Sequence, residues 1–253
     1  MYQGFYELTS GLITQQRKLN TISNNMANVE TAGYKRDTMT VSTFQEEMLI
    51  RTGQTAKKNP TDLAATTPIA AADQTYTDFT QGSFDQTDGK YDFAISGDGF
   101  FTIQTPNGIQ YTRNGAFSVN AQGILCLDNI GTVVGANGGT IRITNENFVV
   151  DDYGRIMSAA GDGTVYGQLR ITGFEDTGTL HKEDNGMFSA PGGGQDLTGR
   201  TRVLNGYLEA SNADMIGQMT EMMSSQRALQ SAAQMLKMYD QVLSKASSDV
   251  GRL

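Results

Sequence analysis

The sequence predicts an α+β fold, in which an antiparallel all-β central domain is flanked by N- and C-terminal helices that pair as a coiled coil. First, apolar residues at both ends of the chain recur about every 3.5 residues, which is typical of helices that supercoil around a partner. Second, apolar and polar residues alternate in the middle of the chain, between Gly- and Asn-containing turns about ten residues apart. Third, no helical pattern separates these strands, which argues against a parallel α/β sheet.

The N-terminal helix is predicted to begin at Phe5 and to end in the run from Ser23 to Asn28. Its apolar residues fall on two lines with heptad spacing, which only Gln15 interrupts. A lone amphipathic helix is marginally stable in water, so this helix needs a partner, and the next comparable pattern lies at the other end of the chain. The predicted interface residues are Phe5, Leu8, Leu12, Leu19, Ile22, Met26 and Val29.

A turn, a short helix and an extended linker are predicted to follow the first helix. Gly33 supplies the turn, since glycine readily adopts the conformation that ends a helix. Thr43 and Glu46 have the spacing of a capping box, which predicts a short helix that includes Met48. Residues 53–75 are rich in Thr, Ala, Asn, Gln and Pro. We interpret them either as an extended linker or as a loop ordered against the rest of the protein.

The central domain is expected to consist of short antiparallel strands. Phe93 and Ile95 alternate with smaller or polar residues, as in a strand with one buried face. The Asn107-Gly108 and Asn114-Gly115 pairs are both typical of tight hairpin turns. The predicted parts are a discontinuous helical domain (1–40 plus 207–253), an extended linker with a short helix (41–78) and a β-rich domain (79–206).

The C-terminal helix is predicted to begin at a cap of the Ser-x-x-Asp type formed by Ser211 and Asp214. Apolar residues then recur with heptad spacing. The methionines among them suggest either a metal or ligand groove, or ordinary packing, and we favour packing because Met fills irregular gaps. The interface residues predicted on this helix are Met215, Met219, Met222, Leu229, Leu236 and Leu243.

Composition argues against several functional classes. The net charge of −8 and pI of about 4.7 argue against nucleic acid as a main partner. No apolar run is long enough to span a membrane. With His181 and Cys126 as the only residues of their types, neither an internal disulfide nor a zinc cluster is expected. No nucleophile motif accompanies His181, and no pair of carboxylates stands out for glycoside hydrolysis, although such a pair is not excluded. We therefore predict no catalytic residues, no cofactor and no metal.

Three runs of sequence resemble bacterial flagellar axial proteins of the rod and hook. The first spans residues 23–36 (SNNMANVETAGYKR), the second covers residues 92–101 and 111–117, and the third includes residues 208–212 (LEASN). Within this family, the resemblance is to the distal rod protein and its close proximal-rod paralogue. The motif residues are Asn24, Asn25, Asn28, Thr31, Gly33, Tyr34, Lys35, Gly97, Asp98, Gly99, Phe100, Phe101, Arg113, Asn114 and Gly115.

The resemblance implies a structural, non-enzymatic subunit of the basal-body rod, which polymerises into a helical tube and transmits torque from motor to hook. It implies the protein itself, other rod and hook subunits and the flagellar type III export apparatus as partners. The N-terminus lacks a charged region followed by an apolar stretch, so we expect export across the inner membrane without a cleavable signal peptide.

Alternatives remain at two levels. Within the class, the alternative is a proximal rod paralogue or a short hook-like protein. From another class, the alternative is a secreted glycan-binding or glycan-cleaving β-domain on a helical stalk. Asn24, Asn25, Asn28 and Arg227 either contribute polar interface contacts or cap the helix and face solvent.

Overall fold

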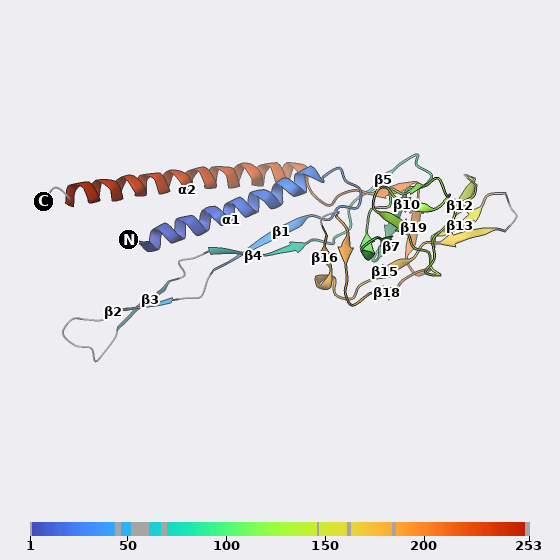
Figure 1. Cartoon of the computed structure of the whole chain (residues 1–253), viewed down its shortest axis with the longest axis horizontal. Helices are drawn as coiled ribbons and strands as arrows, with labels where there is room; N and C mark the ends of the chain where they lie inside the picture. Colours follow the sequence, from blue (N-terminus) through green and yellow to red (C-terminus); the bar gives the residue numbers. More distant parts are fainter. Residues whose placement is uncertain are drawn as a thin grey trace. The chain divides into compact units, whose positions relative to one another are not determined.

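The computed structural model divides into two units, each assembled from separate stretches of the chain (Figure 1). The helical unit comprises Met1–Ala27, Asp37–Tyr76 and Asp214–Leu253, and the β unit comprises Asn28–Arg36 and Thr77–Ala213. The structure describes residues 2–43, 47–51, 61–66, 70–145, 147–160, 163–183 and 186–250; side chains are described in these ranges except at 2–6, between 42 and 73, and at 249–250.

Two long helices, α1 (Tyr2–Ala27) and α2 (Met215–Val250), lie side by side in the helical unit (Figure 1). They are antiparallel, since Asn25 near the end of α1 bonds Gln218 near the start of α2, and Lys18 pairs with Glu221 at 2.8 Å. Neither helix, where described, combines the length and apolar character needed to cross a bilayer.

Helix α2 begins later than the sequence pattern predicted. The carboxylate of Asp214 accepts hydrogen bonds from the backbone N–H groups of Ile216 and Gly217, at 3.1 and 3.0 Å, and therefore caps the first turn. The Ser211 hydroxyl accepts only from the N–H of Ala213, two residues ahead, and caps no helix. Of the two residues in the predicted Ser-x-x-Asp cap, only Asp214 therefore caps the helix, and the part of the prediction that rested on Ser211 was wrong.

Paired strands replace the predicted short helix and linker. Strand β1 (Asp37–Thr43) pairs with β4 (Ala70–Thr77), and β2 (Glu47–Arg51) pairs antiparallel with β3 (Thr61–Thr66). Met48 thus lies in a strand, and the short-helix prediction was wrong because a partner strand binds the backbone of this segment. Within the predicted linker, residues 52–60 and 67–69 lie outside the described residues, as does Glu46 of the predicted cap.

Antiparallel sheets build the β unit, as predicted for the central domain. The largest sheet has the order β16-β17-β8-β7-β11-β10-β9, and β15 joins β7 to β18. Its strands are β7 (Phe100–Thr105), β8 (Gly108–Thr112), β9 (Ser118–Val119), β10 (Leu125–Leu127), β11 (Gly131–Val133), β15 (Ile171–Gly173), β16 (His181–Lys182), β17 (Phe188–Ser189) and β18 (Gln195–Asp196).

Smaller ladders and one short helix complete this unit. The core between the ladders is apolar, with Phe93, Phe101, Leu125, Ile156 and Leu169 wholly buried. The remaining elements are β5 (Phe84–Gln86) paired with β20 (Tyr207–Glu209), β6 (Phe93–Ser96) paired with β19 (Arg202–Asn205), the sheet β12 (Phe148–Val150), β13 (Arg155–Ser158) and β14 (Val165–Gln168), and the 3-10 helix η1 (Thr177–Thr179).

Of the two predicted hairpin turns, the structure contains one. Strands β7 and β8 are joined by a two-residue turn between Thr105 and Gly108. The Asn114-Gly115 pair makes no hairpin, because β8 and β9 are not neighbours in the sheet. A glycine is needed at position 115 because a Cβ there would collide with the backbone of Phe93.

The unit boundaries differ from the predicted ones. Residues 28–36 and 207–213, which the sequence analysis assigned to the helical domain, belong to the β unit, whereas residues 41–76 belong to the helical unit. Close contacts explain the first difference. The N–H of Gly33 donates to the carbonyl of Glu209 at 2.7 Å, and β20 pairs with β5.

Candidate functional site

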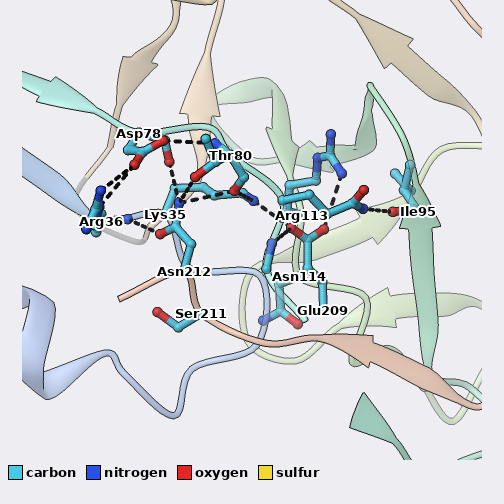
Figure 2. A network of polar contacts seen from close by, with 12 residues as sticks. Lys35, Arg36, Asp78, Thr80, Ile95, Arg113, Asn114, Glu209, Ser211 and Asn212 are labelled. Carbon is cyan, nitrogen blue, oxygen red and sulfur yellow. Dashed lines mark hydrogen bonds and ion pairs between the residues drawn. The ribbon is translucent and has the colours of Figure 1, made fainter. Parts of the chain in front are cut away.

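Three charged side chains meet inside the β unit and form what we call the buried charge cluster (Figure 2). Lys35 Nζ lies 2.5 Å from Glu209 Oε1, and Arg113 Nη1 lies 3.2 Å from Glu209 Oε2. The side chains of Lys35 and Glu209 have no exposed surface, and that of Arg113 is 5% exposed. Each comes from a different part of the chain, so the cluster joins three segments.

Backbone groups add further hydrogen bonds to the cluster, and Arg113 Nε is the atom left buried without a partner. Lys35 Nζ donates to the carbonyl of Thr80 at 2.7 Å, and Arg113 Nη2 donates to the carbonyl of Gly97 at 2.8 Å. The N–H of Gly82 donates to Glu209 Oε1 at 3.2 Å. The guanidinium of Arg113 also lies over the ring of Phe100, 5.1 Å from its centroid. Buried charges are costly unless paired and hydrogen-bonded, and this cluster satisfies both conditions at the carboxylate.

Burial opposes the charge on both cations. Desolvation lowers the pKa of Lys35 below 10.5, against the hydrogen bond and charge of Glu209, which raise it. Desolvation likewise lowers the pKa of Arg113, again opposed by Glu209. A single carboxylate therefore stabilises two buried cations, and this makes Glu209 the central residue of the cluster.

A second group of polar residues lies on one side of the cluster, next to Lys35 (Figure 2). Arg36 bonds the carboxylate of Asp78, with Nε and Nη2 at 3.0 and 2.8 Å from Oδ2. Asn212 accepts from the N–H of Arg36 at 2.8 Å and donates to the carbonyl of Asp78 at 2.7 Å. Burial alone raises the pKa of Asp78, but hydrogen bonds from Thr80 and Arg36 outweigh it and hold that pKa below 3.8.

Gly33 and Tyr34 pack residues 28–36 tightly against the rest of the β unit. Gly33 has a φ of +68°, and a Cβ there would collide with the backbone of Arg113 and Asn114, so two independent constraints require glycine. Tyr34 is buried, and Lys182 Nζ lies 4.1 Å above its ring. Lys182 also donates to the carbonyl of Lys35 at 2.8 Å.

The structure brings together many of the motif residues found in the sequence. Lys35 and Arg113 share Glu209, while Gly97 and Phe100 contact Arg113. The remaining motif residues of the β unit make other contacts: Phe101 is wholly buried in the core, Asp98 is exposed and its carbonyl accepts from Thr201, Gly99 is buried just before β7, Thr31 bonds Asn28, Asn114 Oδ1 accepts from the N–H of Ala116, and Gly115 packs on Phe93.

Sequence reasoning missed the partners that complete this site. Glu209 and Asn212 were noticed only as part of a family motif, and Asp78 and Thr80 were not singled out. One signal was available for Glu209 in the sequence, because it directly follows the large apolar residues Tyr207 and Leu208. In the structure these three residues form a short strand, and the carboxylate is wholly buried. Nothing local identifies Asp78, whose partner Arg36 lies 42 residues away in sequence.

Asn25 performs a similar joining role within the helical unit. Its side-chain amide donates to the carbonyl of Asp37 at 2.8 Å and to Gln218 Oε1 at 3.1 Å, and its oxygen accepts from the N–H of Asp37 at 2.9 Å. One buried amide thus connects α1, the start of β1 and the first turn of α2. Asn24, the neighbouring motif residue, is exposed, as is Arg227 on α2.

The predicted interface residues fall into three groups by exposure. Ile22 is buried, while Met215, Met219 and Leu243 are exposed by 44%, 43% and 37%. The side chain of Phe5 lies outside the described residues. The half-buried group is Leu8, Leu12, Leu19, Met26, Val29, Met222, Leu229 and Leu236.

The most buried positions of the two helices include polar residues. Thr14 and Asn25 on α1, with Gln218 and Ser225 on α2, are all at most 8% exposed. Five methionines of α2 are exposed in the subunit: Met215, Met219, Met223, Met235 and Met238. The expectation that the methionines pack rather than form a metal or ligand groove stays a prediction. Whether the predicted interface contacts other subunits stays a prediction.

Among the described residues, no group of His, Cys, Asp and Glu has a metal-binding arrangement. His181, the candidate weighed for catalysis, is exposed on β16. The buried charge cluster holds three segments of the chain together, which is a structural task.

Comparison with known proteins agrees with this structural role. Three family models match: "Flagella basal body rod protein" over residues 5–35, "Flagellar hook protein FlgE/F/G D1 domain" over 94–167, and "Flagellar basal body rod FlgEFG protein C-terminal" over 204–249. Among curated relatives, the flagellar basal-body rod protein FlgF of Caulobacter vibrioides is 30% identical, with 100% of this chain and 98% of that protein covered.

Two relatives from Bacillus subtilis (strain 168) match along nearly their whole lengths. The flagellar basal-body rod protein FlgG is 29% identical, covering 96% of this chain and 97% of the relative. The flagellar hook-basal body complex protein FlhO is 28% identical, covering 100% of both. The chain therefore belongs to the flagellar basal-body rod proteins of the rod and hook family.

The family defines the role as a structural subunit of the rod, located in the basal body of the flagellum, that assembles with other rod and hook subunits. This confirms the rod interpretation made from the sequence motifs. The family is a structural one and is not known for enzymes. The alternative of a secreted glycan-binding or glycan-cleaving domain has no support.

Proposed function

We propose that this subunit polymerises with copies of itself into a helical tube that transmits torque from motor to hook. In this tube α1 and α2 pack against neighbouring subunits in coiled-coil fashion. The observation that carries the proposal is the exposed apolar surface of α2. Ile216 is 77% exposed, and Met219, Met223 and Val242 are 43%, 53% and 65% exposed.

Such a surface is unfavourable in an isolated subunit. Burying one Met, Ile or Leu side chain contributes about 1.5–3 kcal/mol, and extended apolar patches commonly mark interfaces. Because exposed apolar residues recur along α2, a neighbouring subunit that covers them would gain this stabilisation at several positions. Contacts of a heterologous kind between identical subunits continue indefinitely and produce an open helical filament.

Polar residues lie where α1 and α2 pair with each other. They support a division between this pairing surface and the apolar surface that is left for neighbouring subunits. Asn25 and Gln218 bond each other, and Thr14 and Ser225 are also buried. Buried polar pairs between helices select one register at some cost in stability. The apolar residues of α2 that this pairing leaves exposed are then available for neighbours, together with the interface residues predicted on both helices.

The buried charge cluster gives the tube a mechanical connection. Residues 28–36 follow α1 directly and carry Lys35, while residues 207–213 precede α2 and carry Glu209. Both segments are bound inside the β unit through the same carboxylate. A load applied through either helix therefore reaches a segment that buried ion pairs hold in place.

Delivery to the rod is also part of the proposal. We infer that the flagellar type III export apparatus is a partner and carries the chain across the inner membrane without cleavage of a signal peptide. The support for this step is the family membership.

A charge placed on the apolar face of α2 tests the assembly proposal. Met219→Asp should abolish sedimentable polymer and motility, because a carboxylate would be buried at each subunit contact. The isolated subunit should keep its free energy of unfolding within about 0.5 kcal/mol, because the replaced side chain is exposed.

Val149→Asp is the matched control, since Val149 is 54% exposed but lies on β12 of the β unit. It should leave polymerisation unchanged. Normal polymers of the Met219→Asp protein would show that this face of α2 is not an assembly surface.

A further inference from the structure

Helix α2 contains six methionines, and most of them are accessible to solvent. Met222 is half-buried. The other five, Met215, Met219, Met223, Met235 and Met238, are 44%, 43%, 53%, 50% and 56% exposed. Elsewhere among the described side chains, Met26, Met39 and Met157 are half-buried, and Met187 is 1% exposed within the core of the β unit. Accessible thioethers are therefore concentrated on one helix.

We propose that the exposed methionines of α2 form a reversible oxidation site whose modification prevents this helix from packing against a neighbouring subunit. The oxidant is a peroxide such as hydrogen peroxide. The second half of the proposal, the effect on assembly, rests on the proposed polymerisation through α2.

The reaction at each site is a two-electron oxidation of sulfur. The thioether lone pair attacks one peroxide oxygen, the O–O bond breaks, and the departing hydroxide takes up the proton of the new sulfur-bound hydroxyl and leaves as water. Sulfur gains one oxygen atom and becomes a sulfoxide, while the peroxide is reduced. Methionine sulfoxide reductases reverse this change, so the site can return to its first state.

Oxidation changes the property that the proposed interface needs. A thioether is apolar and flexible, whereas a sulfoxide is polar and chiral and disrupts Met-rich interfaces. Met215 and Met238 lie 23 positions apart in a helix, which corresponds to about 35 Å. Modification therefore places polar groups along much of the length of the helix rather than at one end.

Burial predicts which methionines react first. Met222 and Met223 are neighbours in sequence and share a helix, but only Met223 is exposed. They form a matched pair in which sequence context is nearly constant and accessibility differs. Met187 serves as the fully buried reference.

The first experiment treats the full chain with hydrogen peroxide, samples it over time and measures sulfoxide at each methionine by peptide mass analysis. Met223 should oxidise about tenfold faster than Met187, and faster than Met222, because exposure controls access of the oxidant. Equal rates at Met223 and Met187 would overturn the assignment of α2 as the oxidation site. This outcome does not depend on whether the chain polymerises.

The second experiment measures sedimentable polymer before oxidation, after oxidation and after treatment with methionine sulfoxide reductases. Oxidation should remove most of the polymer, and reduction should restore it. A variant with all five exposed methionines changed to leucine should polymerise and should ignore peroxide, since Met-to-Leu changes conserve volume and apolar character. Undiminished polymer from the fully oxidised wild type would overturn the regulatory part.

The two proposals fail in distinguishable ways. If the untreated chain forms no polymer, the proposed function is wrong, and with it the effect on assembly, while the peptide rates still decide whether α2 is the oxidation site. If the untreated chain polymerises and the oxidised chain does so equally, only the further inference is wrong.

Discussion

Glu209 shows how a single residue can connect distant parts of a chain. Its two carboxylate oxygens bind Lys35 and Arg113, and its backbone carbonyl accepts from Gly33. The side chain is wholly buried, so water cannot replace any partner that is lost. The consequences of changing it are therefore large compared with those of changing a surface carboxylate.

Glu209→Gln should lower the free energy of unfolding of the β unit by about 3–5 kcal/mol, because two cations would remain buried without a counter-charge. Urea denaturation followed by tyrosine fluorescence measures this loss. Glu221→Gln is the control, since it breaks the exposed pair with Lys18 and should cost no more than about 1 kcal/mol. Similar losses for both variants would contradict the role assigned to the cluster.

Asp78 should contribute to the acid sensitivity of the protein. Its folded-state pKa is held below 3.8 by hydrogen bonds from Thr80 and Arg36 that outweigh the opposing effect of burial. As pH falls below about 4, the unfolded chain binds more protons than the folded chain, so the free energy of unfolding decreases. This stabilisation is present above the unfolded-state pKa and is lost as pH falls through the folded-state pKa.

Asp78→Asn should therefore flatten the decline in stability between about pH 5 and pH 2. Urea midpoints at a series of pH values provide the measurement. Asp196 also has a lowered pKa, through bonds with Thr198, but it is present in both proteins and cancels in the comparison. An unchanged pH slope in the variant would show that Asp78 is not a source of acid sensitivity.

At the scale of elements, the two helices illustrate a division between polar and apolar faces. α1 buries Thr14 and Asn25 beside Ile22, and α2 buries Gln218 and Ser225. The hydrophobic spacing correctly predicted two helices, since the apolar period is a local property of the sequence. It did not reveal that small and polar residues would occupy the most buried positions, because burial depends on the partner helix.

Asn25→Ala should lower the free energy of unfolding by about 1–3 kcal/mol, because both backbone groups of Asp37 and the side chain of Gln218 lose a partner. Thermal unfolding monitored by circular dichroism at helical wavelengths measures the change. Asn20→Ala is a matched control on the same helix, where the side chain is exposed. It should be neutral or slightly stabilising, given the higher helix propensity of Ala. Equal effects of the two changes would contradict the joining role of Asn25.

At the scale of the whole molecule, the β unit needs a segment that lies far from the rest of it in sequence. Residues 28–36 precede the remainder of the unit, Thr77–Ala213, by about 40 residues of the helical unit. They supply Gly33, Tyr34, Lys35 and Arg36 to the β unit. A β-domain defined by strand patterns alone, such as the predicted 79–206, omits both Lys35 and Glu209.

A fragment of residues 28–213 should therefore unfold at a higher temperature than a fragment of residues 77–213. The shorter fragment lacks Lys35, which removes one of the two cations bound by Glu209, and lacks the packing of Tyr34. Differential scanning calorimetry of both fragments makes the comparison. If the two melt at the same temperature, the N-terminal segment does not contribute to the stability of the β unit.

Local patterns in the sequence were sufficient to predict two terminal helices, an antiparallel β-rich centre, the hairpin before Gly108 and membership of the rod and hook family. These features depend on periodicity, turn chemistry and short motifs, all of which act over a few residues. The strand at Glu47–Arg51 and the extent of the β unit depended on tertiary structure. So did the pairing of Lys35 with Glu209, 174 positions apart. Each of these features is decided by a partner that comes close only when the chain folds. For Lys35 and Glu209, the buried charges select each other because water does not reach them.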